Sequence, residues 1–306
     1  MKSRVVIVMY HRISTRIDNS SLRPTSPGIF ENQIRYFVQN YEVISLHQIV
    51  KYLAEGKFPE DKKALVITFD DGYKDNYACA YPILKKYGVP ATIFLIAQNI
   101  GSEELFWWDK VAYLVRHTKL AELQLDELGT YSLETGPDRS GVTHMICQGL
   151  MSVPDQRKNM LIAKVQEICG LEVPKYLGSR MILSWDEVKE MSENGIDFGA
   201  HSLTHPILTN MPPDAARHEI ASSKLEIQSR IGKNADFFCY PNGVYSADVS
   251  NIVKESGFAG AVTTDPNWIS TRTDPYLLGR VPGSDDFNIL KAVLCGLWGD
   301  LWTVLG

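Results

Sequence analysis

The sequence has few cysteines, no long apolar run and no excess of basic charge. The five cysteines among 306 residues form no CxxC pair, which argues against a disulfide framework or a cysteine-based zinc site. No stretch approaches the roughly 18 consecutive apolar residues that a transmembrane helix needs. The net charge is −5, without the basic footprint that is typical of nucleic-acid-binding proteins. The N-terminal apolar run lacks the cleavage site of a signal peptide, so we expect a cytoplasmic protein.

Short apolar runs alternate with helical patterns along most of the chain. Buried strands that alternate with helices are typical of a parallel sheet covered on both faces, and seven or eight such units favour a barrel. We therefore expect an α/β fold of the TIM-like barrel type. Strands are expected at residues 5–10, 41–46, 64–69, 90–96, 197–200, 236–240 and 260–263, and helices at 31–40 and 77–87.

Residues 101–180 break this alternation and are longer than an ordinary connection. Helical patterns cover residues 106–116 and 155–168, whereas residues 123–133 alternate apolar and polar side chains around Gly129, which indicates a hairpin. We interpret the chain as one domain over residues 1–306 with a mixed helical and hairpin insertion, a candidate cap for one end of the barrel.

The C-terminal residues 287–305 carry one apolar stripe at helical spacing. Such an amphipathic helix packs either on the barrel or, as the alternative, on a membrane surface. Few basic residues flank it, which weakens the membrane interpretation and leaves peripheral contact as a secondary expectation. The stripe consists of Phe287, Leu290, Leu294, Leu297, Leu301 and Leu305, and is widened by Trp298 and Trp302.

Two adjacent carboxylates, Asp70 and Asp71, follow the strand expected at residues 64–69. In a parallel barrel the carboxyl ends of the strands form the active face. Adjacent carboxylates raise each other's pKa unless a cation neutralises one of them, so a bound metal would leave the second free as a base. The alternative is an Asp-Asp-Gly turn in which Asp71 accepts hydrogen bonds from backbone amides.

Two histidines, His201 and His205, follow the strand expected at residues 197–200. Histidines four residues apart lie on one face of a helical turn and can bind one metal together. With one aspartate they would make a site that leaves positions open for water and substrate. The alternative for either histidine is a hydrogen-bonded core residue.

These motifs resemble those of the polysaccharide deacetylase family, also called the NodB homology domain or carbohydrate esterase family 4. Residues 68–73 are similar to the first family motif, 201–205 to the second, and Phe-Cys-Tyr-Pro-Asn-Gly at 238–243 to a variant of the third. Residues 10–12 and 183–187 resemble the branch that acts on exopolysaccharides. The resemblance implies a distorted (β/α)7 barrel.

The resemblance also implies a role for each matching residue. Asp71, His201 and His205 would hold a divalent metal, with zinc as the first candidate. Asp70 would be the general base that takes a proton as water attacks the acetamide carbonyl. The backbone N–H of Asn242 would help to stabilise the oxyanion.

The sequence departs from the better-known family members at two positions. They supply the general acid from a late Leu-x-His motif, but no histidine follows His218, so His11 is the candidate acid. The alternatives are a structural role for His11 and a proton that Asp70 carries both ways. Many members have an arginine in the third motif where this chain has Cys239. Arg280, from a later strand end, is the candidate partner that would keep Asp70 ionised, unless it is a surface residue.

Aromatic residues near the motifs are candidates for sugar binding. Tyr73, Tyr240 and the neighbouring Pro241 lie within catalytic motifs, and Trp107 and Trp108 open the insertion. Most aromatic side chains in a chain of this size belong to the core, which is the alternative for each of them.

The resulting prediction is a metal-dependent hydrolase of linear amide bonds. Its expected substrate is the N-acetyl group of an amino sugar in a polysaccharide, an oligosaccharide or a glycan precursor. One alternative is a deformylase or another amidase that acts on a lipid- or nucleotide-linked sugar or on a non-sugar amide. A second is a catalytically silent glycan-binding barrel, which has no need for the complete set of Asp70 and three metal ligands.

Overall fold

The computed structural model describes residues 5–15, 22–58, 63–125, 128–133 and 139–295. The chain divides into two compact units. The first comprises Met1–Thr15, Pro24–Ile100 and Leu183–Gly306, and the second comprises Arg16–Arg23 and Gly101–Ile182.

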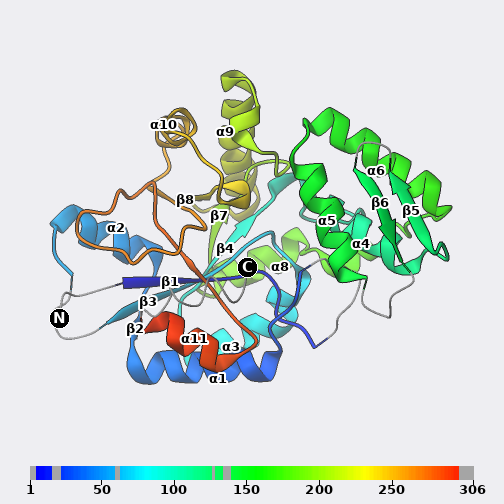
Figure 1. The fold of residues 1–306 in the computed structure, drawn as a ribbon. Coiled ribbons are helices and arrows are strands. Elements are labelled where there is room, and N and C mark those ends of the chain that lie inside the picture. Colours follow the sequence, from blue (N-terminus) through cyan, green and yellow to red (C-terminus); the bar gives the residue numbers. More distant parts are fainter. Residues whose placement is uncertain (1–4, 16–21, 59–62, 126–127, 134–138, 296–306) are drawn as a thin grey trace. The chain divides into compact units, whose positions relative to one another are not determined.

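The first unit is built on a curled parallel sheet (Figure 1) with the strand order β10-β1-β3-β4-β7-β8-β9. A bridge between Val262 and Leu278 joins β9 to the segment that leads into β10, and β10 pairs with β1. The expected distorted α/β barrel is therefore confirmed. Its strands are β1 (Val5–Tyr10), β2 (Glu42–Val43), β3 (Ala64–Phe69), β4 (Thr92–Leu95), β7 (Asp197–Ala200), β8 (Phe237–Cys239), β9 (Gly260–Val262) and β10 (Val281–Pro282), with β2 paired to the start of β3.

The register of β1 and β3 decides where the chemistry lies. All six residues of β3 are buried, as expected for a strand covered on both faces. The two strands run parallel from the pair Val5–Ala64 to the pair Tyr10–Phe69. Both strands therefore end at the same level, and the residues that follow them leave the same end of the barrel.

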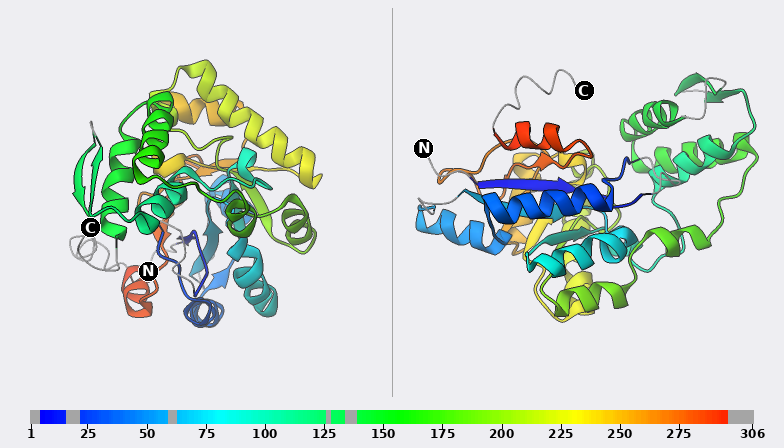
Figure 2. Two further views of the ribbon diagram at one scale, coloured as in Figure 1. Left: turned by 90° about the vertical axis from the view of Figure 1, so that its right-hand side faces the viewer. Right: turned by 90° about the horizontal axis from the view of Figure 1, so that it is seen from below.

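Helices surround the strands of this unit. The left view of Figure 2 looks along the strands and shows α1 in blue, α9 in yellow and α11 in red around them. A buried stripe of Phe30, Ile34 and Phe37 makes α1 amphipathic. The helices are α1 (Pro27–Asn40), α2 (Leu46–Glu55), α3 (Tyr81–Tyr87), α8 (Trp185–Glu193), α9 (Pro213–Ile231), α10 (Ala247–Glu255) and α11 (Phe287–Leu294), with short turns η1 (Asn76–Ala80), η2 (Ala97–Asn99), η3 (Leu208–Asn210) and η4 (Pro241–Gly243).

Among the elements that differ from their predicted bounds, two do so for clear local reasons. The strand expected at residues 41–46 is only two residues long, because the Ser45 side chain accepts a hydrogen bond from the Gln48 N–H and begins α2 at Leu46. The helix expected at 77–87 begins as the π-helical turn η1. Pro82 has no N–H to donate back along a regular helix, and the wider turn precedes it.

The C-terminal helix α11 packs on the first unit. Its residues Leu290, Val293 and Leu294 are buried, and the Phe287 ring lies edge-on to Tyr36 of α1, with centroids 5.5 Å apart. Leu297, Trp298, Leu301, Trp302 and Leu305 of the expected stripe lie outside the described residues. Among the described helices, none is long and apolar enough to cross a membrane.

The second unit consists of helices and a hairpin. The predicted hairpin is confirmed, with antiparallel pairs from Glu122–Ser132 to Leu125–Gly129. The helices expected at 106–116 and 155–168 are also present, whereas two further helices were not predicted. The elements are α4 (Trp107–His117), β5 (Glu122–Leu125), β6 (Gly129–Ser132), α5 (Ser140–Met151), α6 (Asp155–Cys169) and α7 (Tyr176–Met181).

Candidate active site

Polar side chains meet where β1, β3, β7 and β8 end. His11 follows β1, Asp70 and Asp71 follow β3, and His201 follows β7. Because the Asp70 N–H donates a hydrogen bond of 2.9 Å to the Tyr10 carbonyl, the loops after β1 and β3 leave the barrel together.

A tight turn separates the two carboxylates. Asp71 and Gly72 have φ values of 74° and 84°, in the left-handed region, and the Gly72 N–H donates to the Asp70 carbonyl. A side chain at Gly72 would place its Cβ 2.8 Å from Ile100 Cδ1 and 2.9 Å from Leu95 Cδ2, so the position requires glycine. The turn places Asp70 against Arg280 and Asp71 against His201.

Asp71, His201 and His205 form a candidate metal triad. All three are buried, and one ligand atom from each lies within 4.8 Å of the others. Asp71 Oδ1 and His201 Nε2 are 3.5 Å apart, and the two imidazole centroids are 4.7 Å apart. Two tetrahedral ligands that are each about 2.0–2.1 Å from a zinc ion lie about 3.3–3.4 Å from each other. The donor set therefore fits a divalent metal with one position left open.

The orientation of His201 supports this interpretation. Its Nδ1–H donates a hydrogen bond of 2.8 Å to the Cys239 carbonyl, which leaves the Nε2 lone pair directed at Asp71. Burial lowers the pKa of His201 to about 4, so the ring is neutral at pH 7. A neutral imidazole with a fixed tautomer is the form that binds a metal.

The prediction that His201 and His205 lie on a helical turn is wrong. Ser202 and His205 have φ values of 60° and 62°, so this segment is a loop rather than a helical turn. The His205 N–H donates to the Ser202 hydroxyl at 2.9 Å. The two left-handed residues fold the loop back and bring both rings to the same side.

Glu219 of α9 holds this loop and was missed by the sequence analysis. The residue is 7% exposed, and its carboxylate accepts three hydrogen bonds from the loop. The N–H groups of Leu203 and Thr204 donate to Oε2 at 2.9 Å, and the Thr204 hydroxyl donates to Oε1 at 2.8 Å. No local pattern marks one glutamate on a polar helix, because its partners lie 15 and 16 residues earlier.

Arg280 and Asp70 form a buried bidentate ion pair. Both guanidinium nitrogens Nη1 and Nη2 donate to the carboxylate at 2.7 Å, and Arg280 is 0% exposed. Burial alone would raise the pKa of Asp70, but the Arg280 charge and its hydrogen bonds outweigh burial and hold that pKa well below its ordinary value. Asp70 is therefore ionised at neutral pH.

The position of Arg280 in the fold differs from the expected strand end. It directly precedes β10, whose Val281 pairs with Val8 in the middle of the barrel. The long side chain therefore reaches Asp70 from below the strand ends. On the way it donates to the Thr263 carbonyl from Nε and to the Thr68 hydroxyl from Nη1.

His11 lies beside Asp70 with a partly open ring. Its side chain is 33% exposed, and Nε2 is 4.0 Å from Asp70 Oδ2. Burial lowers the pKa of His11 below its ordinary value, and the charge of Asp70 offsets only part of this effect. The His11 carbonyl accepts a hydrogen bond from the Asn76 side chain, which fixes the loop after β1.

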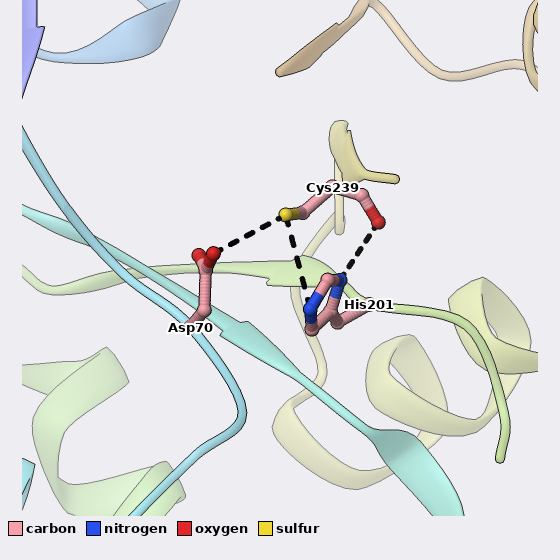
Figure 3. Close-up of side chains that lie close together, drawn as sticks. All are labelled: Asp70, His201 and Cys239. Atoms are coloured by element: carbon pink, nitrogen blue, oxygen red, sulfur yellow. Dashed lines mark hydrogen bonds between the residues drawn. The ribbon is translucent and has the colours of Figure 1, made fainter. Parts of the chain in front are cut away.

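Cys239 lies beside both Asp70 and His201 (Figure 3). Its sulfur lies 3.6 Å from Asp70 Oδ2 and 4.0 Å from His201 Nε2, and it accepts a hydrogen bond of 3.1 Å from Arg280 Nη2. Burial raises the pKa of the Cys239 thiol well above its ordinary value, so the thiol is protonated at neutral pH. The sequence marks this residue only as a departure from the family motif.

The remaining expected site residues have different environments. Asn242 is exposed in η4 with a φ of 54°, and among the described residues no group accepts a hydrogen bond from its N–H. Tyr73 and Tyr240 are 0% exposed and Pro241 is buried, so their expected contact with a sugar is wrong. The Tyr73 ring instead packs under Arg12, and the Tyr240 hydroxyl donates to the Tyr276 carbonyl at 3.1 Å.

The two tryptophans belong to the second unit. Trp108 is buried there and stacks on Phe106 with centroids 4.9 Å apart, so it is a core residue rather than a subsite. Trp107 is half-buried with the Lys158 ammonium 5.1 Å from its ring centroid. Its role in substrate binding stays a prediction.

A comparison of the sequence with protein families shows to which family the chain belongs. The family described as polysaccharide deacetylase matches residues 57–261, about two thirds of the chain. The chain belongs to this family. It is accordingly a hydrolase of the polysaccharide deacetylase type, which acts on amide bonds, as the sequence predicted.

Two curated relatives are similar over much of the chain. YxkH of Bacillus subtilis is 25% identical over 280 residues, which cover 91% of this chain and 71% of the relative. The poly-beta-1,6-N-acetyl-D-glucosamine N-deacetylase of Staphylococcus epidermidis is 29% identical over 208 residues, which cover 62% of this chain and 64% of that enzyme.

Two solved structures share the fold. The Streptococcus pyogenes deacetylase PplD in complex with acetate matches with a TM-score of 0.65 at 20% identity, over 96% of this chain and 99% of that one. IcaB from Ammonifex degensii matches with a TM-score of 0.59 at 17% identity, over 94% of each chain. At these identities the likeness shows the fold alone.

Proposed function

We propose that this hydrolase removes N-acetyl groups from an amino-sugar polysaccharide of the exopolysaccharide type in a metal-dependent reaction. The observation that carries the proposal is the pair of adjacent aspartates with different partners, Asp71 in the histidine triad and Asp70 on Arg280. The curated relative from Staphylococcus epidermidis, named for deacetylation of poly-beta-1,6-N-acetyl-D-glucosamine, supports this substrate class.

Asp71, His201 and His205 would hold the metal, for which we propose zinc because two imidazoles and one carboxylate suit that ion. When bound, a zinc ion lowers the pKa of a coordinated water and polarises a carbonyl oxygen. The Cys239 carbonyl and Glu219 would keep the histidines oriented, because each fixes a part of the ligand loop.

Asp70 would act as the general base. It is the carboxylate next to the triad that is not one of its ligands, and Arg280 keeps it ionised and in one orientation. Because the same guanidinium weakens the carboxylate as a base, Asp70 needs an acidified water as its proton donor. The metal and the base therefore depend on each other in this proposal.

Asn242 and His11 would serve the later steps. The backbone N–H of Asn242, an exposed residue, would donate to the oxyanion that forms when the acetamide carbonyl is attacked. The His11 ring is neutral at pH 7, so it would first take up a proton, with Asp70 4.0 Å away as its nearest source. It would then protonate the leaving amine from its partly exposed position.

Acetate release tests the proposal. The substrate would be short β-1,6-linked N-acetylglucosamine oligomers, with the protein loaded with zinc, treated with a chelator, and then reloaded. We expect acetate release that depends on zinc and that is about 10²–10⁴-fold slower in Asp70→Asn, which is the usual rate contribution of a general base. Asp248→Asn, an exposed aspartate in the first turn of α10, is the matched control and should keep full activity. Full activity in the chelated protein or in Asp70→Asn would contradict the proposal.

A further inference from the structure

A second group of potential metal ligands lies beside the triad. Asp70, His201 and Cys239 are all buried, and their ligand atoms also lie within 4.8 Å of one another. Figure 3 shows the carboxylate of Asp70, the sulfur of Cys239 and the imidazole of His201 directed toward one another. His201 belongs to both groups, and its Nε2 atom lies near Asp71 in one group and near Cys239 in the other.

The spacing of these atoms resembles that around a tetrahedral ion. For zinc, with a metal–sulfur distance of about 2.3 Å and metal–oxygen or metal–nitrogen distances of about 2.0–2.1 Å, the other tetrahedral ligands lie about 3.6 Å from the sulfur. Cys239 Sγ is 3.6 Å from Asp70 Oδ2 and 4.0 Å from His201 Nε2. The sulfur–oxygen distance already matches, and the imidazole has to move closer both to the sulfur and to the Asp70 carboxylate, which lies within 4.8 Å of it.

The surroundings would support an ion held by two anionic ligands. Arg280 Nη2 donates to both Asp70 Oδ2 and Cys239 Sγ, and each acceptor keeps a further lone pair for a metal. A guanidinium that donates to both ligands offsets the charge that a carboxylate and a thiolate bring together. The Cys239 carbonyl holds the other side of the His201 ring and keeps Nε2 directed inward.

We propose that Asp70, His201 and Cys239 form an alternative position for a thiophilic divalent ion such as cadmium. The two positions exclude each other, because His201 Nε2 has one lone pair to give. Binding replaces the S–H bond of Cys239 by a sulfur–metal bond, and the proton leaves to the buffer. Since the ion would also take Asp70, which we propose as the base, cadmium in this position should inhibit the deacetylation proposed above.

Cadmium binding can be followed without any activity. We would titrate cadmium into the metal-free protein and record the ultraviolet charge-transfer band of the cadmium–thiolate bond. We expect a band that saturates at one ion per chain, persists in Asp71→Asn and is lost in Cys239→Ser. Cys295→Ser, which removes the one exposed cysteine among the described residues, is the matched control and should keep the band.

The wild-type protein alone provides a second test if Cys239→Ser does not fold. The cadmium NMR resonance of the complex should have the shift of a site with one sulfur ligand rather than one with only nitrogen and oxygen ligands. Bound cadmium without a thiolate band, or a band that survives Cys239→Ser, would overturn the inference. The result is independent of acetate release with zinc, so failure of either proposal can be recognised separately.

Discussion

Replacement of Arg280 by methionine removes the charge that holds Asp70 and keeps most of the side-chain volume. In the wild type the guanidinium is completely buried and makes two hydrogen bonds of 2.7 Å to the carboxylate. The variant leaves that carboxylate buried without its cation. Breaking one side of a buried ion pair costs about 3–5 kcal/mol of unfolding free energy. With the guanidinium gone, burial becomes the dominant influence on the Asp70 carboxyl and raises its pKa.

The difference in unfolding free energy between the wild type and Arg280→Met should depend on pH. In the wild type the native pKa of Asp70 lies below the unfolded-state value of about 3.9, so Asp70 stabilises the fold above about pH 4. That stabilisation is lost as the pH falls through the native pKa. In Arg280→Met burial raises the native pKa of Asp70 above the unfolded value, so the charged carboxylate destabilises the fold instead of stabilising it. The variant should therefore lose less unfolding free energy, relative to the wild type, at pH 5 than at pH 7.

Urea unfolding of the metal-free protein at pH 7 and pH 5 measures this deficit, and the acid limb of kcat/KM measures the pKa. The limb should move to higher pH in Arg280→Met. Arg217→Met, which removes an exposed pair with Glu255, should change neither quantity, because surface pairs contribute little. An Arg280→Met protein whose unfolding free energy is within about 1 kcal/mol of the wild type, with an unmoved acid limb, would show that Arg280 does not hold Asp70 ionised.

Three further predictions concern the ligand loop, the second unit and the base of the barrel. Glu219→Gln replaces one of the two side-chain oxygens that accept hydrogen bonds from the ligand loop, and it should weaken zinc affinity by about 10–100-fold in a chelator competition. Glu226→Gln on the same helix is the control, and equal zinc affinities of the two variants would contradict the role of Glu219. Gly178→Ala should lower the free energy of unfolding by about 1–3 kcal/mol in urea, because its Cβ would overlap the Glu103 carbonyl. Gly141→Ala, whose Cβ would meet open space, should not destabilise the protein, and similar urea midpoints for the two variants would be evidence against this packing. Burial raises the pKa of Asp197, so its charged form destabilises the folded protein above about pH 4. Asp197→Asn should therefore raise the thermal midpoint at pH 7, and a lower midpoint would show that the Asp197 charge stabilises the fold.

The sequence predicts the barrel because its strands are continuous apolar runs bounded by helices. Residues 5–10 and 64–69 form strands with the predicted bounds. The same pattern places Asp70, Asp71 and His201 at strand ends, since parallel strands deliver the residues that follow them to one end of the barrel. That part of the site follows from local patterns alone.

The rest of the site depends on contacts between distant segments. The spacing of His201 and His205 suits a helical turn, but the backbone takes left-handed values that the sequence does not signal. Glu219 reaches the loop from another element, and Arg280 reaches Asp70 from inside the barrel. An aromatic residue beside a motif, such as Tyr73, can face substrate or core, and only the packing decides between them.

Anomalous diffraction from crystals of the zinc-loaded protein would show directly which aspartate binds the metal. We expect one zinc peak among Asp71, His201 and His205, with Asp70 still paired to Arg280. A peak elsewhere, or a zinc ion bound by Asp70 instead of Asp71, would contradict the assignment of one aspartate to the metal and the other to the base.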